Sequence, residues 1–187
     1  MTDHITEPPV APGRDDDTSR INGALVRLES ALASRPGFGR ATQSSETTLV
    51  DGVRCRSEEH GFAVDCDLPA GLGGTGTGPS PSVLMRAALG SCLAMGYLLR
   101  AARRGVAVQS IRVVVETDSA VAGMLRTDAA EPAGFLAVRY HVEIASDAPR
   151  EDVVALVDEA DRLSPMLDAV SRANHPVRSL SIVEGTR

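Results

Sequence analysis

One stretch decides the fold: residues 78–104, with the sequence GPSPSVLMRAALGSCLAMGYLLRAARR. Ser80 can serve as an N-cap, and Pro81 then occupies the first helical position, where a missing N–H group costs nothing. At the other end, arginines fill the last turn, and Gly105 suits the left-handed conformation that ends many helices. These signals predict one helix over residues 80–104, about 36 Å long. Because the helix is apolar on most sides, we expect it to be the core helix of the fold.

Cys92 lies near the middle of this predicted helix, on the same face as Met85, Ala88 and Leu89. Two interpretations stay open at this point. A free cysteine in a helix is often a small apolar side chain that fills a core. Alternatively, Cys92 is a reactive thiolate beneath a cleft, which would make it the centre of a site.

The composition fits one domain with an aliphatic core. Of 187 residues, 43% are hydrophobic but only 3% are aromatic. A net charge of −6 and the shortage of aromatic stacking groups argue against a nucleic-acid partner. The unbroken run of apolar and small residues, 87–99, is shorter than a bilayer requires, so we expect no membrane association. Three cysteines in a chain without a basic, apolar leader predict reduced thiols and a cytoplasmic location.

The N-terminal region predicts two pieces outside the main domain. Residues 1–18 are rich in proline and aspartate and lack an apolar period, which predicts a mobile tail. Within residues 19–36, apolar side chains recur at intervals of three and four, which predicts an extra amphipathic helix ended by Arg35-Pro36-Gly37. Residues 37–187 are then expected to form the main domain.

The main domain alternates between runs of strands and runs of helices. Before the long helix, strands are predicted over residues 40–49, 52–56 and 61–67, with a turn at 57–61. After it, the strand patterns cover 106–117, 135–145 and, at the end, 177–183. Two helices precede the last strand, one capped by Ser146 or Asp147 and one over residues 166–173. This order predicts an α+β fold with antiparallel sheets.

The segment PSVLMRAALGSCL, residues 81–93, resembles the signature of the OsmC/Ohr family, the osmotically inducible and organic hydroperoxide resistance proteins. In that family a P-x-x-L-L-x-A-A-L-x-S-C run opens the central helix and ends at the peroxidatic cysteine. Residues 67–74, DLPAGLGG, are similar to the family's D-x-P-x-x-x-G-G entry into the helix. The resemblance covers residues 40–185. It implies antiparallel sheets packed around the cysteine-bearing helix, in an intertwined homodimer with the cysteine sites at the interface.

The same resemblance implies the chemistry of the site. Cys92 occupies the place of the peroxidatic thiol, which must be ionised at neutral pH to attack a peroxide. The family uses an arginine from an N-terminal strand to favour the thiolate. Arg54 and Arg56 are the candidates, and strand alternation places both on one face and Cys55 on the other.

The chain departs from the family pattern at two positions. Ser82 stands ten residues before Cys92, where the organic hydroperoxide resistance branch has a glutamate that holds the arginine. Ser164, in the Ser-Pro pair before the last predicted helix, occupies the place of the family's resolving cysteine. Serine cannot form a disulfide, so the usual intramolecular redox cycle is interrupted. Cys55 and Cys66 either resolve an oxidised Cys92 in its place or are core side chains.

These features predict a thiol-dependent organic hydroperoxide reductase whose partners are a second copy of the chain, a small hydroperoxide and an external thiol reductant. The alternative is a non-enzymatic relative that binds a small hydrophobic ligand in the same pocket. No cofactor is expected, because the glycine-rich residues 71–76 are not followed by the βαβ unit of a dinucleotide site. No metal is expected either, because the spacing of Cys55, His60 and Cys66 is not a zinc pattern.

Overall fold

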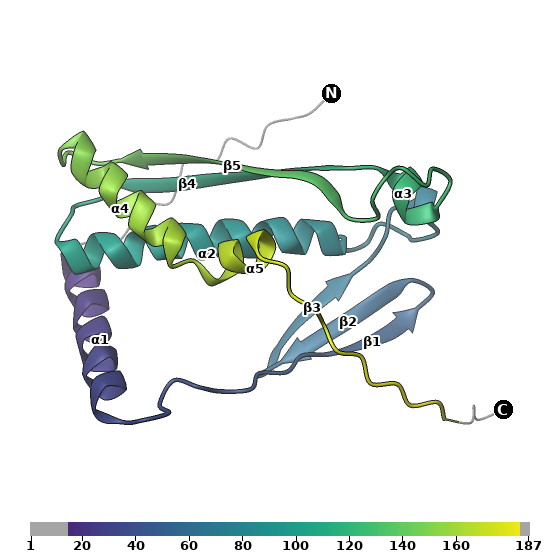
Figure 1. The fold of residues 1–187 in the computed structure, drawn as a ribbon, viewed down its shortest axis with the longest axis horizontal. Coiled ribbons are helices and arrows are strands. Elements are labelled where there is room, and N and C mark those ends of the chain that lie inside the picture. The colour runs from purple at the N-terminus through teal and green to yellow at the C-terminus, as the bar shows by residue number, and fades with distance from the viewer. Residues whose placement is uncertain (1–14, 184–187) are drawn as a thin grey trace.

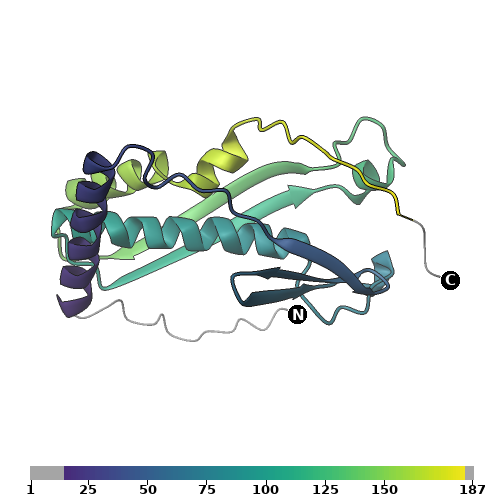
Figure 2. The same ribbon diagram turned by 90° about the horizontal axis from the view of Figure 1, so that it is seen from below.

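The computed structural model describes residues 15–183 and confirms the predicted α+β fold with antiparallel sheets (Figure 1). A long helix, α2, lies at the centre, with a two-stranded sheet on one side and two short helices against it. A separate three-stranded sheet lies beyond its N-terminal end, and α1 crosses its C-terminal end (Figure 2). The elements are α1 (Asp15–Ser34), β1 (Glu46–Asp51), β2 (Arg54–Glu59), β3 (Phe62–Cys66), η1 (Ala70–Leu72), α2 (Pro81–Arg104), β4 (Ser110–Ser119), α3 (Val121–Leu125), β5 (Phe135–Ala145), α4 (Arg150–Arg162) and α5 (Pro165–Ser171).

The helix α2 has the ends that the sequence predicts. Ser80 is its N-cap in an extended conformation, and Pro81 is its first residue. Gly105 ends it with a φ of 67°, and the Gly105 N–H group donates to the carbonyl of Ala101. By length and composition alone this helix is long and apolar enough to cross a membrane, although the unbroken apolar run within it, residues 87–99, is shorter. Its contacts with β4, α4, α5 and α1 are those of a core helix in a folded domain.

The core forms along one stripe of α2. Leu89, Leu93, Tyr97 and Ala101 follow each other at intervals of four and are buried. They pack with Leu156 and Ala160 of α4, and half-buried aliphatic side chains of β4 and β5 complete the cluster. Each large aliphatic side chain buried in this way contributes about 2 kcal/mol.

The opposite face of α2 is not covered, in contrast to the prediction of a helix buried on most sides. Met95 is 59% exposed, and Val83 and Leu99 are exposed as well. The apolar residues of α2 therefore form two surfaces of the helix. One surface packs against other elements of the chain, and no element within residues 15–183 covers the other.

The two-stranded sheet pairs β4 with β5 in antiparallel register from Ser110↔Ala145 to Thr117↔Val138, with an irregularity near Ser119. The strand β5 has the predicted bounds. The strand β4 begins at Ser110 rather than at residue 106, because residues 106–109 make the turn from α2 into the sheet. A short helix, α3, lies in the connection between β4 and β5.

The three-stranded sheet has the order β1-β2-β3 and is antiparallel throughout. The first strand begins at Glu46, later than the predicted residue 40. The turn between β2 and β3 is shorter than predicted and consists of His60 and Gly61, with φ values of 49° and 80°. Two consecutive positive φ values are the mark of a type I′ turn, which suits the twist of a hairpin.

The helices outside the core differ from the predictions mainly at their first residues. The helix α1 begins at Asp15 instead of residue 19, and Arg103 of α2 binds it through Glu29, with nitrogen and oxygen 2.6 Å apart. Residues 1–14 of the predicted tail lie outside the described residues. The helix α4 has Pro149 as its N-cap. Neither predicted cap serves, because the Ser146 hydroxyl instead donates to the carbonyl of Ala107 and accepts from the Ala148 N–H group.

The predicted closing strand over residues 177–183 is wrong for the single chain. No strand is assigned there, and Leu180 and Ile182 are 70% and 88% exposed. The sequence has the alternation of a strand, but strand formation requires a neighbour to accept its backbone hydrogen bonds. Within the described part of the chain, this segment has no such neighbour.

Candidate functional site

Cys92 and Ser164 lie together where α2 meets the junction of α4 and α5. The Cys92 Sγ atom is 3.5 Å from the Ser164 Oγ atom, within hydrogen-bonding distance for sulfur. Ser164 is buried and is the N-cap of α5, since its hydroxyl accepts from the Leu167 N–H group at 3.3 Å. The chain thus brings together the thiol and the serine that the sequence singles out, although 72 positions separate them.

A cavity of about 580 Å³ opens beside this pair. Its lining is mostly apolar and comes from one face of α2 and from the α4–α5 junction. The lining residues are Ala88, Ser91, Cys92, Met95, Gly96, Leu99, Arg100, Ala160, Leu163, Ser164, Pro165 and Met166. Sequence reasoning did not name most of them, but the signal was present: the α2 members follow Cys92 at helical intervals of three and four.

Arg100 is the cation of this cavity, and it also escaped the sequence analysis. Its Nη1 atom is 3.6 Å from Glu159 Oε1, and Arg104 binds the other oxygen of the same carboxylate. These contacts lower the pKa of Glu159, mainly through the hydrogen bond from Arg104. Arg100 is therefore tied to α4 at the rim of the cavity.

Two tyrosines hold the α4 end that carries Ser164. The Tyr97 and Tyr140 hydroxyl groups donate to the two carboxylate oxygens of Asp161, at 2.7 and 2.8 Å. Burial, followed by the contact with Asp161, raises the pKa of Tyr140 to about 12 and raises the pKa of Tyr97 further. The Ser164 N–H group donates to the Asp161 carbonyl at 3.3 Å. This network fixes the turn that places the Ser164 hydroxyl against Cys92.

The two candidate arginines lie elsewhere, on the three-stranded sheet. Arg56 binds Glu58 and Asp65 at 3.2 and 3.1 Å, and these contacts raise its pKa, with the hydrogen bond to Glu58 contributing most. Arg54 lines a different cavity, of about 250 Å³, beside the glycine-rich loop. Neither arginine lines the Cys92 cavity within the chain.

The glycine-rich loop is organised around Asp67. The Asp67 carboxylate accepts hydrogen bonds from the N–H and hydroxyl groups of Thr75 and Thr77 and from the Leu68 N–H group. These bonds, led by the one from the Thr75 hydroxyl, lower the pKa of Asp67 strongly. A Cβ atom on Gly74 would sit 1.8 Å from the Leu68 carbonyl oxygen, so only glycine fits there. The pairing of Asp67 with Gly74 explains the D-x-P-x-x-x-G-G pattern physically.

Comparison with known proteins gives the family. The family model described as OsmC-like protein matches residues 74–179, more than half of the chain. This chain belongs to the OsmC-like family. The matched range includes Cys92 and Ser164 but neither Arg54 nor Arg56. No curated protein matches the sequence.

Solved structures share the OsmC-like fold at low sequence identity. An OsmC-like protein from Mycoplasma pneumoniae has a TM-score of 0.61 and 14% identity, over 70% of this chain and 88% of that one. An organic hydroperoxide resistance protein OsmC from Legionella pneumophila has a TM-score of 0.52 and 19% identity, over 70% and 91%. An organic hydroperoxide resistance protein from Elizabethkingia anophelis has a TM-score of 0.51 and 18% identity, over 70% and 90%. At these identities, the likeness establishes the fold.

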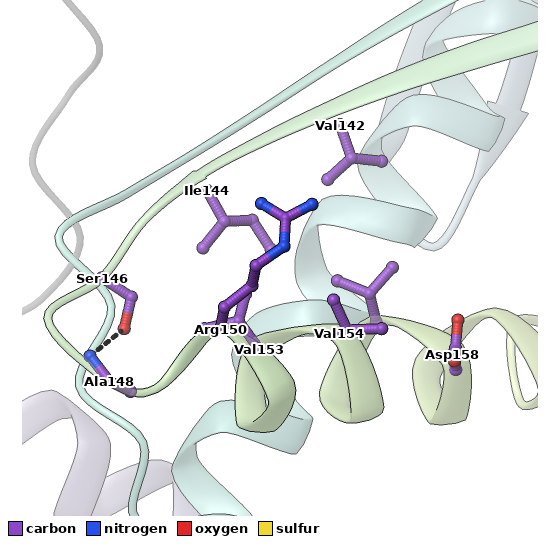
Figure 3. Close-up of a pocket in the computed structure, with 9 residues that line it drawn as sticks. Val142, Ile144, Ser146, Ala148, Arg150, Val153, Val154 and Asp158 are labelled. Atoms are coloured by element: carbon purple, nitrogen blue, oxygen red, sulfur yellow. Dashed lines mark hydrogen bonds between the residues drawn. The ribbon is translucent and has the colours of Figure 1, made fainter.

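This OsmC-like chain has another cavity, of about 420 Å³, between β5 and α4 (Figure 3). Val142 and Ile144 of the strand and Val153 of the helix line it, and the Arg150 side chain extends across it. The Ser146 hydroxyl group also lines this cavity, and it already makes two hydrogen bonds with the backbone. This cavity contains no thiol, so the Cys92 cavity is the better candidate for covalent chemistry.

Proposed function

We propose that the protein reduces organic hydroperoxides through Cys92, with an external thiol as the reductant. The observation that carries this proposal is the position of the Cys92 thiol, which lines an apolar cavity and faces the buried Ser164 hydroxyl at 3.5 Å. An organic hydroperoxide combines an apolar body with a reactive O–O bond, which suits such a cavity. The family membership supports the same substrate class, as do the names of two organic hydroperoxide resistance proteins that share the fold.

The reaction balances in three steps. The Cys92 thiolate attacks the terminal oxygen of the hydroperoxide, the O–O bond breaks, and the alcohol leaves with a proton as Cys92 becomes a sulfenic acid. A small thiol then attacks the Cys92 sulfur, which forms a mixed disulfide and releases water. A second small thiol restores the Cys92 thiol and leaves as a disulfide of the reductant. Ser164 cannot carry the second step, and its hydroxyl instead orients the sulfur and its bound oxygen.

The proposal includes a homodimer, because one chain lacks parts of the site. Neither Arg54 nor Arg56 lines the cavity, and the face of α2 with Met95 is uncovered within the described residues. A second copy that covers this face would bring an arginine of its three-stranded sheet to the thiolate. The arginine favours the ionised thiol that the first step needs.

The test measures consumption of cumene hydroperoxide in the presence of a small thiol. We expect the wild type and the Cys55→Ser/Cys66→Ser double variant to turn over, and the triple variant that also carries Cys92→Ser to be inactive. Mass spectrometry of the double variant after one equivalent of hydroperoxide should find the oxygen or the small thiol on Cys92. Turnover by the triple variant, or an unmodified Cys92 in the double variant, would contradict the proposal.

The second candidate is a non-enzymatic protein that binds a small hydrophobic ligand in the same cavity. Two observations favour it: the Cys92 thiol faces the Ser164 hydroxyl and not a second thiol, and neither Arg54 nor Arg56 lines the cavity within the chain. Binding of an apolar fluorescent probe that Met95→Glu abolishes, together with a Cys92 that hydroperoxide leaves unchanged, would make this the better account.

A further inference from the structure

Two other cysteines face each other across the three-stranded sheet, outside the Cys92 cavity. Cys55 on β2 and Cys66 on β3 are direct partners in the antiparallel register, and both are free thiols. Directly opposed residues in such a ladder have Cα atoms about 4.5–5.5 Å apart, a separation that a disulfide spans. The tight turn at His60 and Gly61 joins the two strands and fixes this register.

The two thiols differ in exposure. Cys66 is 5% exposed, whereas Cys55 is half-buried. Burial raises the pKa of the Cys66 thiol, and the neighbouring Cys55 thiol adds to this rise. A solute therefore reaches the Cys55 thiol first, and the buried Cys66 thiol lies next to it as its cross-strand partner.

The end of β3 is anchored directly after Cys66. The next residue, Asp67, binds the glycine-rich loop through its carboxylate and pairs its own N–H group with the Pro79 carbonyl at 3.2 Å. On the other side of β2, Leu49 of β1 is the register partner of Cys55. Strand pairing and this anchor together hold the two sulfur atoms in one row across the sheet.

We propose that Cys55 and Cys66 form a second redox site, a cross-strand dithiol that an organic hydroperoxide converts into a disulfide within one chain. The Cys55 thiolate takes the terminal oxygen of the hydroperoxide and becomes a sulfenic acid, and the alcohol leaves with a proton. The Cys66 sulfur then attacks the Cys55 sulfur, the S–S bond forms, the S–O bond breaks, and water leaves. Two thiols and one hydroperoxide thus give one disulfide, one alcohol and one water. Cys92 takes no part in this reaction.

The test is a peptide map of the full chain after treatment with cumene hydroperoxide and alkylation of the remaining thiols. In the wild type and in Cys92→Ser, we expect Cys55 and Cys66 to be linked, with a loss of two hydrogen atoms that dithiothreitol reverses. In Cys55→Ser, Cys66 should remain available for alkylation. As a register control, Cys66→Ser/Val64→Cys moves the second thiol to a diagonal position about 7–8 Å away and should abolish the disulfide.

The proposal is overturned if Cys55 and Cys66 both remain alkylatable in the wild type after an excess of hydroperoxide. It is also overturned if either of them is found linked to Cys92, because that would make it a resolving thiol of the first site. Failure of this proposal would leave the proposed reaction at Cys92 unaffected, because that reaction is measured in the variant that lacks both Cys55 and Cys66.

Discussion

Ser164 has two contacts that a cysteine in its place would change. Its hydroxyl accepts the Leu167 N–H group as the cap of α5, and it lies 3.5 Å from the Cys92 sulfur. Replacement of a serine cap typically lowers stability by about 1 kcal/mol. The position therefore couples the start of a helix to the surroundings of the reactive thiol.

Ser164→Cys is predicted to create a disulfide with Cys92 after treatment with one equivalent of hydroperoxide. Two sulfur atoms at this junction need to approach by about 1.5 Å to reach bonding distance, which small side-chain rotations can supply. The measurement is a peptide map without reductant. Ser171→Cys, at the other end of α5, is the matched control and should form no such bond. Absence of a link between Cys92 and the introduced thiol, with both thiols accessible, would mean that Ser164 was assigned to the wrong place.

At this scale, the sequence singles out two residues that the structure brings together at the cavity, Cys92 and Ser164, but not the other residues that line it. Cys92 and Ser164 each follow a local signal, namely the helix signature and the Ser-Pro pair. Arg54 and Arg56 are candidates because the family resemblance implies an arginine from an N-terminal strand, but the position of a strand relative to a distant helix depends on tertiary packing. Arg100 was missed because its role depends on the path of α4, which brings Glu159 to it.

Among the elements, the glycine-rich loop depends most on a single side chain. We predict that Asp67→Asn lowers the unfolding temperature by several degrees at pH 7. The asparagine NH₂ group is a hydrogen-bond donor, and it would face the N–H and hydroxyl donors of the loop that now bind the carboxylate. The control, Asp65→Asn on the exposed face of β3, should have little effect. Thermal unfolding followed by circular dichroism measures both.

The same carboxylate predicts a dependence on pH. The folded pKa of Asp67 is lower than the unfolded value of about 4, so its contribution is present above pH 4 and is lost as the pH falls below it. The wild type should therefore lose stability from pH 4 downward more steeply than Asp67→Asn does. Equal acid slopes for the two proteins would refute this role of Asp67.

The two tyrosines that bind Asp161 predict the opposite dependence of stability on pH. The pKa of Tyr140 is raised from about 10 to about 12, so the neutral phenol stabilises the fold below pH 10 and this contribution is lost as the pH rises through 12. Tyr140→Phe should cost about 1–2 kcal/mol at pH 8 through the lost hydrogen bond. Its stability should then fall less between pH 10 and 12 than that of the wild type. Urea unfolding across this range measures both effects.

Element prediction succeeds where the signals are local. The caps Ser80 and Gly105 lie within one turn of the ends of α2, and β5 is bounded by a glycine and by polar residues, so both were placed to the residue. The strand predicted for residues 177–183 has the right alternation but no neighbour within the described part of the chain. An alternating pattern indicates that a segment can form a strand. Whether a partner strand is available depends on the tertiary or quaternary structure.

For the whole molecule, the uncovered apolar surfaces predict a dimer. Besides Met95 on α2, Phe62 of the three-stranded sheet is 80% exposed, and Leu180 near the C-terminus is 70% exposed. Exposed apolar surface of this extent is typical of an interface. Sedimentation velocity at micromolar concentration should show a dimer. Leu180→Glu should weaken it at least about tenfold in Kd, since a charge must then be buried.

The control for this prediction is Ser179→Glu, which adds the same charge to the neighbouring position on the other side of an extended segment. It should leave the sedimentation coefficient unchanged. A wild type that sediments as a monomer at micromolar concentration would contradict the dimer, and with it the arginine contributed by the second copy.

The unpaired segment after α5 also bears on how long each polypeptide survives. Peptidases cleave extended backbone that no neighbouring strand protects, and Arg178 lies in such backbone. Dilution should therefore accelerate tryptic cleavage after Arg178, whereas high concentration should suppress it. In a cell, the same rule would remove orphan copies and spare assembled ones. Turnover would then match the amount of protein to its capacity to assemble, without a dedicated degradation signal.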